Sequence, residues 1–150
     1  MERYTNTASN GGGGVMVQTD RIGYVQQCTF IANSVATFGG GFQVLDFVCY
    51  FTPCTFNANI ASYGGGISAF EQYAAHGFVL CSACTFDRNL GRSAAGAIEI
   101  SKNLVVTLTA CTSPYGNVIM FHFKCSYLNE IRVFLHRNWF QFHLVRSGNP

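Results

Sequence analysis

One short motif, Cys-Thr-Phe-x-x-Asn, recurs along this chain of 150 residues at nearly regular intervals. Three copies are complete, a fourth stops after Cys-Thr, and successive cysteines lie 26, 30 and 27 residues apart. The copies begin at Cys28, Cys54, Cys84 and Cys111. Self-similarity at such a period is the signature of a repeat architecture, in which each repeat buries its apolar face against the next.

A cluster of glycine and other small residues follows each complete copy and an earlier half-copy, and a short alternating stretch follows each cluster. The first and third residues of every stretch are apolar, and the middle residues are Met16, Gln43, Ser68 and Glu99. Because successive side chains of a strand point to opposite faces, the pattern predicts short strands with one buried and one solvated face. The four middle residues are therefore expected in water.

Short strands separated by glycine turns bury their apolar faces by stacking coil upon coil. We therefore predict an all-β fold, a single-stranded right-handed parallel β-helix like that of pectate lyase, with about four to five coils over residues 1–128. The right hand follows from the general rule for parallel crossovers. An antiparallel β-sandwich also has short strands and glycine turns, but it does not explain why one triplet recurs at the same point of every cycle.

In such a solenoid, equivalent residues of successive coils lie about 4.8 Å apart and form ladders. Phenylalanines are expected to stack inside, cysteines to form a second internal row, and threonines to point outward. Asparagines are expected at a corner, where each side-chain amide bonds the next and the backbone is left-handed. The internal and corner ladders are Phe30, Phe56 and Phe86; Cys28, Cys54, Cys84 and Cys111; and Asn33, Asn59 and Asn89. The outward row is Thr29, Thr55, Thr85 and Thr112.

Composition excludes several classes of protein. Charged residues make up only 11% of the chain and the net charge is +2, which is too small for the basic surface of a nucleic-acid-binding protein. No run of about 20 apolar residues is present, so no membrane span is expected in this segment. The first residues lack the basic and apolar regions of a secretory signal peptide.

The repeat decays from Ser113 onward. Between residues 129 and 145, the apolar positions fit helical spacing loosely. These positions are Ile131, Phe134, Leu135, Phe140 and Leu144. We expect residues 129–150 to form a C-terminal cap over the open end of the solenoid, where strand edges would otherwise be exposed, or to be a tail that is not native to the fold.

Seven cysteines, an odd number, leave at least one unpaired within the chain. Cys81 and Cys84 have the spacing of zinc ligands, and Cys49 and Cys54 complete a set of four thiols. The repeat also places Cys49 and Cys81 at core positions, where a free cysteine behaves as a small hydrophobe. Their aligned equivalents are Val79 and Val106 for Cys49, and Val25, Phe51 and Leu108 for Cys81. We therefore expect buried thiols first, disulfides between coils second and a zinc site third.

Parallel β-helices include polysaccharide lyases and hydrolases, whose chemistry needs clustered carboxylates. The chain has seven acidic residues, and only Asp20 and Asp46 occupy loosely equivalent places in neighbouring coils. We interpret these two as solvated loop charges, and we predict no catalytic residue and no cofactor. A fragment of a carbohydrate-active enzyme stays the alternative, and a separation of more than about 10 Å between the two carboxylates would argue against it.

The pairing of F-x-x-N with a following G-G-[AG]-[ILV] resembles the repeats of chlamydial polymorphic outer membrane proteins. Phe30 and Asn33 begin the first of three F-x-x-N copies, and the glycine half is carried by residues 12–15, 39–42, 64–67 and 95–98. The resemblance covers about residues 6 to 112, and Phe42 departs from the usual small or aliphatic residue. It implies a right-handed β-helix in a surface-exposed passenger that is used in adhesion and anchored by a separate C-terminal barrel.

These features predict a non-enzymatic segment of a larger surface or extracellular protein, with a structural or adhesive role. The expected partners are a host-surface protein or a carbohydrate, and further coils could stack end to end on this segment. The longest loop, from Glu71 to Gly77, is the expected variable contact. The expected location, secreted or on the cell surface as an outer-membrane passenger, rests on the resemblance alone.

Overall fold

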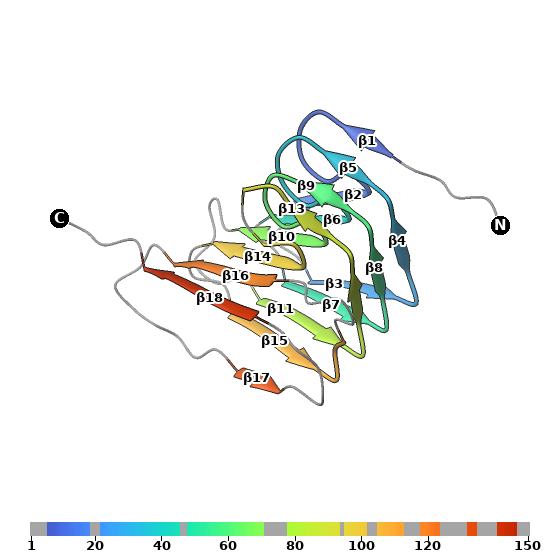
Figure 1. The fold of residues 1–150 in the computed structure, drawn as a ribbon. Coiled ribbons are helices and arrows are strands. Elements are labelled where there is room, and N and C mark those ends of the chain that lie inside the picture. The colour runs from blue at the N-terminus through green and yellow to red at the C-terminus, as the bar shows by residue number, and fades with distance from the viewer. Residues whose placement is uncertain are drawn as a thin grey trace.

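The computed structural model describes residues 6–18, 22–45, 48–70, 78–93, 95–101, 105–112, 118–123, 132–134 and 141–146. In this part of the chain every regular element is a β-strand, and all paired strands are parallel. The strands form four sheets that run along one axis, coil after coil (Figure 1). The chain is therefore an all-β parallel β-solenoid, as the repeat predicts.

The winding backbone passes through the four sheets in turn, and we name them A to D. Sheet A contains β1 (Thr7–Ala8), β5 (Ser34–Val35), β9 (Ile60–Ala61) and β13 (Leu90–Gly91). Sheet B contains β2 (Val15–Gln18), β6 (Phe42–Leu45), β10 (Ile67–Phe70), β14 (Ile98–Ser101), β16 (Val118–Phe123) and β18 (Gln141–Arg146). Sheet C contains β3 (Ile22–Gln26), β7 (Val48–Thr52), β11 (Phe78–Ser82), β15 (Val105–Thr109) and β17 (Arg132–Phe134). Sheet D contains β4 (Thr29–Ile31), β8 (Thr55–Asn57) and β12 (Thr85–Asp87).

Three coils of the described chain contribute a strand to all four sheets, so the solenoid has about three complete turns where four to five coils were expected. The fourth coil has strands in sheets A, B and C, and only a single bridge from Thr112 to Thr85 continues sheet D. The C-terminal segment then adds β17 to sheet C and β18 to sheet B. The apolar spacing of residues 129–145 loosely predicted a helix, but residues 132–134 and 141–146 form strands.

The register of the sheets follows the alignment of the sequence repeat. Val79 of β11 pairs with Cys49 of β7 on one side and with Val106 of β15 on the other. The strands that follow the glycine clusters also pair without a slip, because Ile67 lies between Phe42 and Ile98. A slip of one residue would turn every side chain of a strand to the opposite face, so the repeated apolar positions specify this register.

A stack of phenylalanine rings forms the centre of the core. Phe56 lies between Phe30 and Phe86, with ring centroids 4.9 and 5.0 Å apart and the planes nearly parallel. Phe51 meets Phe56 edge to face at 5.6 Å, and Phe42 meets Phe51 in the same way at 5.0 Å. Offset-stacked and edge-to-face pairs are the favoured aromatic geometries, so this cluster stabilises the coils beyond the burial of its area.

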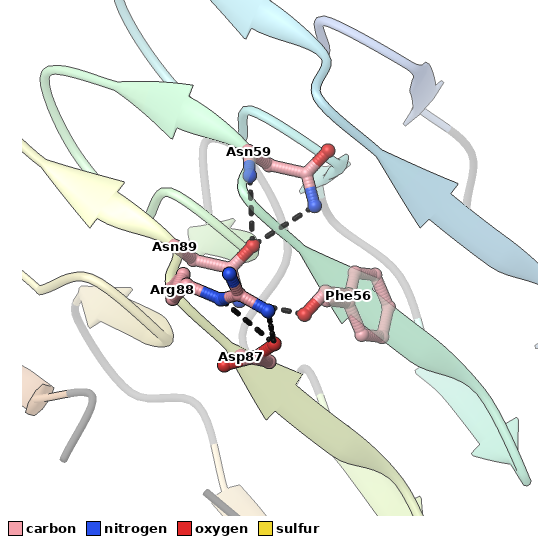
Figure 2. Close-up of polar contacts among 5 residues, drawn as sticks. All are labelled: Phe56, Asn59, Asp87, Arg88 and Asn89. Atoms are coloured by element: carbon pink, nitrogen blue, oxygen red, sulfur yellow. Dashed lines mark hydrogen bonds and ion pairs between the residues drawn. The ribbon is translucent and has the colours of Figure 1, made fainter. Parts of the chain in front are cut away.

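The asparagines form a continuous hydrogen-bonded ladder at the corner between sheets D and A. Asn33 donates to the Asn59 Oδ1 atom through its backbone N–H at 3.1 Å and through its side-chain amide at 3.0 Å, and Asn59 donates to Asn89 in the same way (Figure 2). Asn6 extends the ladder by one more coil. The amides of Asn59 and Asn89 also donate to the carbonyls of the phenylalanines one coil back.

The left-handed residue at this corner is not the asparagine but the residue before it. Ala32 and Ala58 have φ of 53°, and Arg88 has φ of 50°. The expectation that asparagine itself adopts this backbone is therefore wrong. Each asparagine amide must point into the ladder, so the preceding residue makes the bend, although the left-handed conformation costs roughly 1–2 kcal/mol for a residue with a Cβ atom.

The middle residues of the sheet B strands are buried, which corrects the expectation that they lie in water. The exposed fractions of Gln43, Ser68 and Glu99 are 3%, 1% and 5%, whereas Met16 in the first coil is 52% exposed. Two of these buried side chains keep an oxygen without a hydrogen-bond partner, at Gln43 Oε1 and Glu99 Oε2. Sheet B is thus covered on both faces at β6, β10 and β14.

The glycine turns explain part of this burial, because they fold back against the outside of sheet B. Gly39 and Gly64 have φ of 65° and 62°, and a Cβ atom on them would lie within about 3 Å of the backbone of the following strand. The ring of Phe38, beside the first of these turns, packs on Tyr63 and Phe70, with both centroid distances 5.1 Å. Turns and rings together form a second, outer layer of packing on sheet B.

Candidate functional site

The cysteines of the repeat form a single file along the inside of the bend between sheets C and D. The carbonyls of Cys28, Cys54 and Cys84 each accept a 2.9 Å hydrogen bond from the N–H of the threonine one coil further on, which is Thr55, Thr85 and Thr112 respectively. Cys54, Cys84 and Cys111 are buried, and Cys28, at the N-terminal end of the file, is partly exposed. The thiol of each buried cysteine in the file donates to a backbone carbonyl of the coil before it. The pairs are Cys54 with Val25 at 3.3 Å, Cys84 with Phe51 at 3.4 Å, and Cys111 with Cys81 at 3.2 Å.

The remaining two described cysteines, Cys49 and Cys81, lie on strands and point into the core. Both are fully buried. Burial, and after it the neighbouring Cys81 and Cys54, raises the pKa of the Cys49 thiol to about 12, and burial also raises the pKa of the Cys81 thiol. Such thiols are poor nucleophiles, because the thiolate is the reactive form.

The zinc hypothesis is not supported by the arrangement of these thiols. Among the described residues, which include Cys49, Cys54, Cys81 and Cys84, no three histidine, cysteine, aspartate or glutamate side chains form a group that could hold a metal ion. The six described cysteines are free thiols, so no disulfide joins neighbouring coils there. Structural zinc sites need four ligands that converge on one ion.

The carboxylates that would carry the alternative enzymatic function lie mostly outside the described residues. This holds for Asp20 and Asp46 and for the loop from Glu71 to Gly77. The two carboxylates of the described chain are Asp87 at the end of β12, which pairs with Arg88 at 3.1 Å, and Glu99 in β14. Asp87 belongs to sheet D and Glu99 to sheet B, so the described residues place no two carboxylates on the same sheet.

Glu99 gives the stability of the protein a specific pH dependence. Burial raises the pKa of its carboxyl from 4.5 to about 7. Between these two values the unfolded chain loses its proton first, so the free energy of unfolding falls as the pH rises, and the loss is complete above pH 7. We expect Glu99→Gln to stabilise the protein by up to about 3 kcal/mol at pH 8 and to change little at pH 4. Urea unfolding at both pH values measures this, and an equal effect at both would contradict it.

The outer face of sheet C carries an exposed row of aromatic residues that the repeat analysis missed. Tyr24 and Tyr50 stack with centroids 5.1 Å apart and an interplanar angle of 13°, and Tyr50 contacts Phe78 at 5.9 Å. Tyr24 is 68% exposed, and Ile22 beside it is 58% exposed. The signal was present in the sequence, because the two tyrosines are 26 residues apart, as are Cys28 and Cys54.

Two columns of hydroxyl side chains lie on the two sides of the bend between sheets C and D. The predicted outward column is present on sheet D, where the hydroxyls of Thr85 and Thr112 are 3.2 Å apart. A second column stands at the end of sheet C, where Ser82 pairs with Thr109 and, one residue beyond the Cys81–Phe51 pair, is aligned with Thr52. All members of both columns, including Thr29 and Thr55, are partly or fully exposed. We call the outward side chains of β3, β7 and β11 together with the two hydroxyl columns the tyrosine–hydroxyl face.

Comparison with known proteins adds no assignment to this geometry. The chain matches no family model, no curated protein and no solved structure. Within the described ranges, no helix has the length and apolar character needed to cross a membrane.

Proposed function

We propose that this chain is a non-enzymatic β-solenoid segment with a structural and adhesive role at a cell surface or outside the cell. The finer features of the proposal are a right-handed winding and kinship with polymorphic outer membrane protein repeats. Support for a structural role comes from the continuous ladders, which fill the core with phenylalanine, cysteine and asparagine from successive coils. Support for adhesion comes from the tyrosine–hydroxyl face, and above all from the exposed Tyr24–Tyr50 stack.

A carbohydrate chain is the partner whose chemistry suits this face best. Exposed apolar surface on a soluble protein marks an interaction site, and tyrosine combines a large ring with a polar hydroxyl. The outward residues of β3, β7 and β11 include no charged side chain, and hydroxyls border the rings on one side. A neutral polysaccharide presents the same mixture of C–H surface and hydroxyl groups. The outer side of sheet C, where the rings of successive coils lie side by side, also lets a long chain lie along the solenoid axis across several coils.

Binding of the purified chain to a panel of neutral and acidic polysaccharides tests this proposal. We expect binding to at least one neutral polysaccharide, and we expect the Tyr24→Ser, Tyr50→Ser double variant to bind it about five- to 150-fold more weakly, since each aromatic contact contributes about 0.5–1.5 kcal/mol. Leu90→Ser is the matched control, because Leu90 is also exposed but lies on sheet A.

Three outcomes would contradict the proposal. Binding to none of the polysaccharides would exclude the carbohydrate partner, and equal binding by the tyrosine variant would exclude this face. Shortening of the bound polysaccharide during incubation would show that the chain is an enzyme. Attachment of beads coated with the chain to host cells that have been stripped of surface glycans would instead favour a protein partner.

A further inference from the structure

The cysteine file, made of Cys28, Cys54, Cys84 and Cys111, carries a thiol in every coil, although the packing of the core does not need one. A solenoid core requires small apolar side chains at this bend, and alanine or valine would serve. Instead, sulfur recurs in four successive coils, at Cys28, Cys54, Cys84 and Cys111. The thiol of Cys84 interacts with the thiols of both its neighbours in the file, Cys54 and Cys111, and also with the thiol of Cys81 on β11. The sulfur atoms are therefore consecutive neighbours along the axis.

The spacing within this file suits a metal ion with two ligands in line. Adjacent coils of a parallel sheet are separated by about 4.8 Å, and equivalent side chains inherit this separation. A thiolate–metal bond is about 2.3 Å long for an ion such as zinc, so a linear sulfur–metal–sulfur unit spans about 4.6 Å. Two thiols of neighbouring coils can thus hold one ion between them with little movement of the backbone.

The chemistry of the site selects among metals. Thiolates are soft ligands that prefer ions such as Cu(I), while carboxylate and carbonyl oxygens suit Mg²⁺ and Ca²⁺. Zinc requires four ligands in a tetrahedron, and the described residues offer no group of three or more suitable side chains. An ion that accepts two-coordinate geometry needs only the pairs that the file supplies.

We propose that the cysteine file binds Cu(I) by linear two-coordinate bridges between successive thiols, with Cys84 shared by its neighbours Cys54 and Cys111. Over Cys54, Cys84 and Cys111, two bridges form four S–Cu bonds and break three S–H bonds, because Cys84 serves both bridges, and three protons leave to solvent with no change in oxidation state. Cys28 is the entry point, because it is the partly exposed end of the file and lies one coil from Cys54. The thiol hydrogen bonds to backbone carbonyls are lost on binding, which limits the affinity.

Titration of the reduced, anaerobic protein with Cu(I) against a chromophoric Cu(I) chelator tests the proposal. All proteins carry Cys125→Ser, which removes the seventh thiol. We expect the parent to bind Cu(I), to melt at a higher temperature with it, and to show a shell of two sulfurs by X-ray absorption. Cys84→Ala removes the shared ligand and is expected to lower the affinity at least tenfold. Cys49→Val is the matched control, because valine stands at the paired position 79.

Several results would overturn this assignment. They are equal Cu(I) affinity in the parent and Cys84→Ala, an equal loss in Cys49→Val, a shell of oxygen or nitrogen ligands, and a melting temperature that falls on addition of Cu(I). The last result would mean that the ion binds the thiols of the unfolded chain. If Cys84→Ala does not fold, Cys111→Val removes one end of the same file and carries the same expectation. Binding of Zn²⁺ with equal stoichiometry would favour the zinc hypothesis instead.

Discussion

Replacing Asn59 by aspartate is expected to destabilise the protein by at least about 3–5 kcal/mol near neutral pH, which is a large part of the stability of an ordinary domain. Asn59 is fully buried, and its side-chain amide donates to Asn89 Oδ1 and to the Phe30 carbonyl, each at 2.9 Å. Aspartate has the same shape but presents an oxygen to these two acceptors. The substitution therefore removes two hydrogen bonds and leaves a buried charge facing like partial charges.

Chemical unfolding of Asn59→Asp as a function of pH measures this effect. Protonation of the new carboxyl restores one donor, so the pKa of this group is raised in the folded state and the lost stability returns as the pH falls. Asn10→Asp is the matched control. Asn10 is exposed, so its new carboxylate stays in water, and we expect a loss below about 1 kcal/mol. Equal losses in both variants would show that the ladder has no special role.

Truncation of Phe56 to alanine is expected to cost about 3–5 kcal/mol. The ring is fully buried, stacks on Phe30 and Phe86, and meets Phe51 edge to face. Its removal opens a cavity in the middle of the stack and leaves the flanking rings without a partner on one side. Because each coil contacts only its neighbours, the coils on either side cannot close this gap without breaking the sheet register.

Guanidinium unfolding of Phe56→Ala, with Tyr24→Ala as control, tests this expectation. Tyr24 also belongs to a ring stack, but it is largely exposed on the outer face, and among the described aromatic residues it contacts Tyr50 alone. We expect the control to lose less than about 1 kcal/mol. A loss of that small size for Phe56→Ala would mean that the coils are held by their backbone ladders and not by the central stack.

The architecture could be predicted from the sequence because residues that align with each other in the repeat lie next to each other in a solenoid. Cys49 aligns with Val79 in the repeat and pairs with it in the sheet, and Phe30 aligns with Phe56 and stacks on it. Each coil must place the same kind of side chain over the last one. The position of a residue within its repeat therefore predicts its neighbours, even for residues 26 to 30 positions apart.

Features that depend on how turns fold in space could not be predicted in this way. Alternation along the strand gives Gln43 and Glu99 the pattern of solvated residues, yet packing on the outside of sheet B buries both. The left-handed backbone falls on Ala58 instead of Asn59, because side-chain direction, and not conformational tolerance, decides which residue bends. The Tyr24–Tyr50 stack lies outside the recurring motif, so a search for that motif passed over it.

The unequal lengths of the coils have a consequence for how such a chain can evolve. The step from Cys54 to Cys84 is 30 residues against 26 for the step before it, and the connection between β10 and β11 is longer than that between β6 and β7. Growth between strands leaves the stacked rings and amides untouched. A duplication or deletion of one whole coil, such as residues 29–54, has a similar effect. After it, each remaining strand again pairs with a strand from the same position in the repeat. Genes for such chains can therefore gain or lose whole turns by unequal recombination, without inventing a new contact.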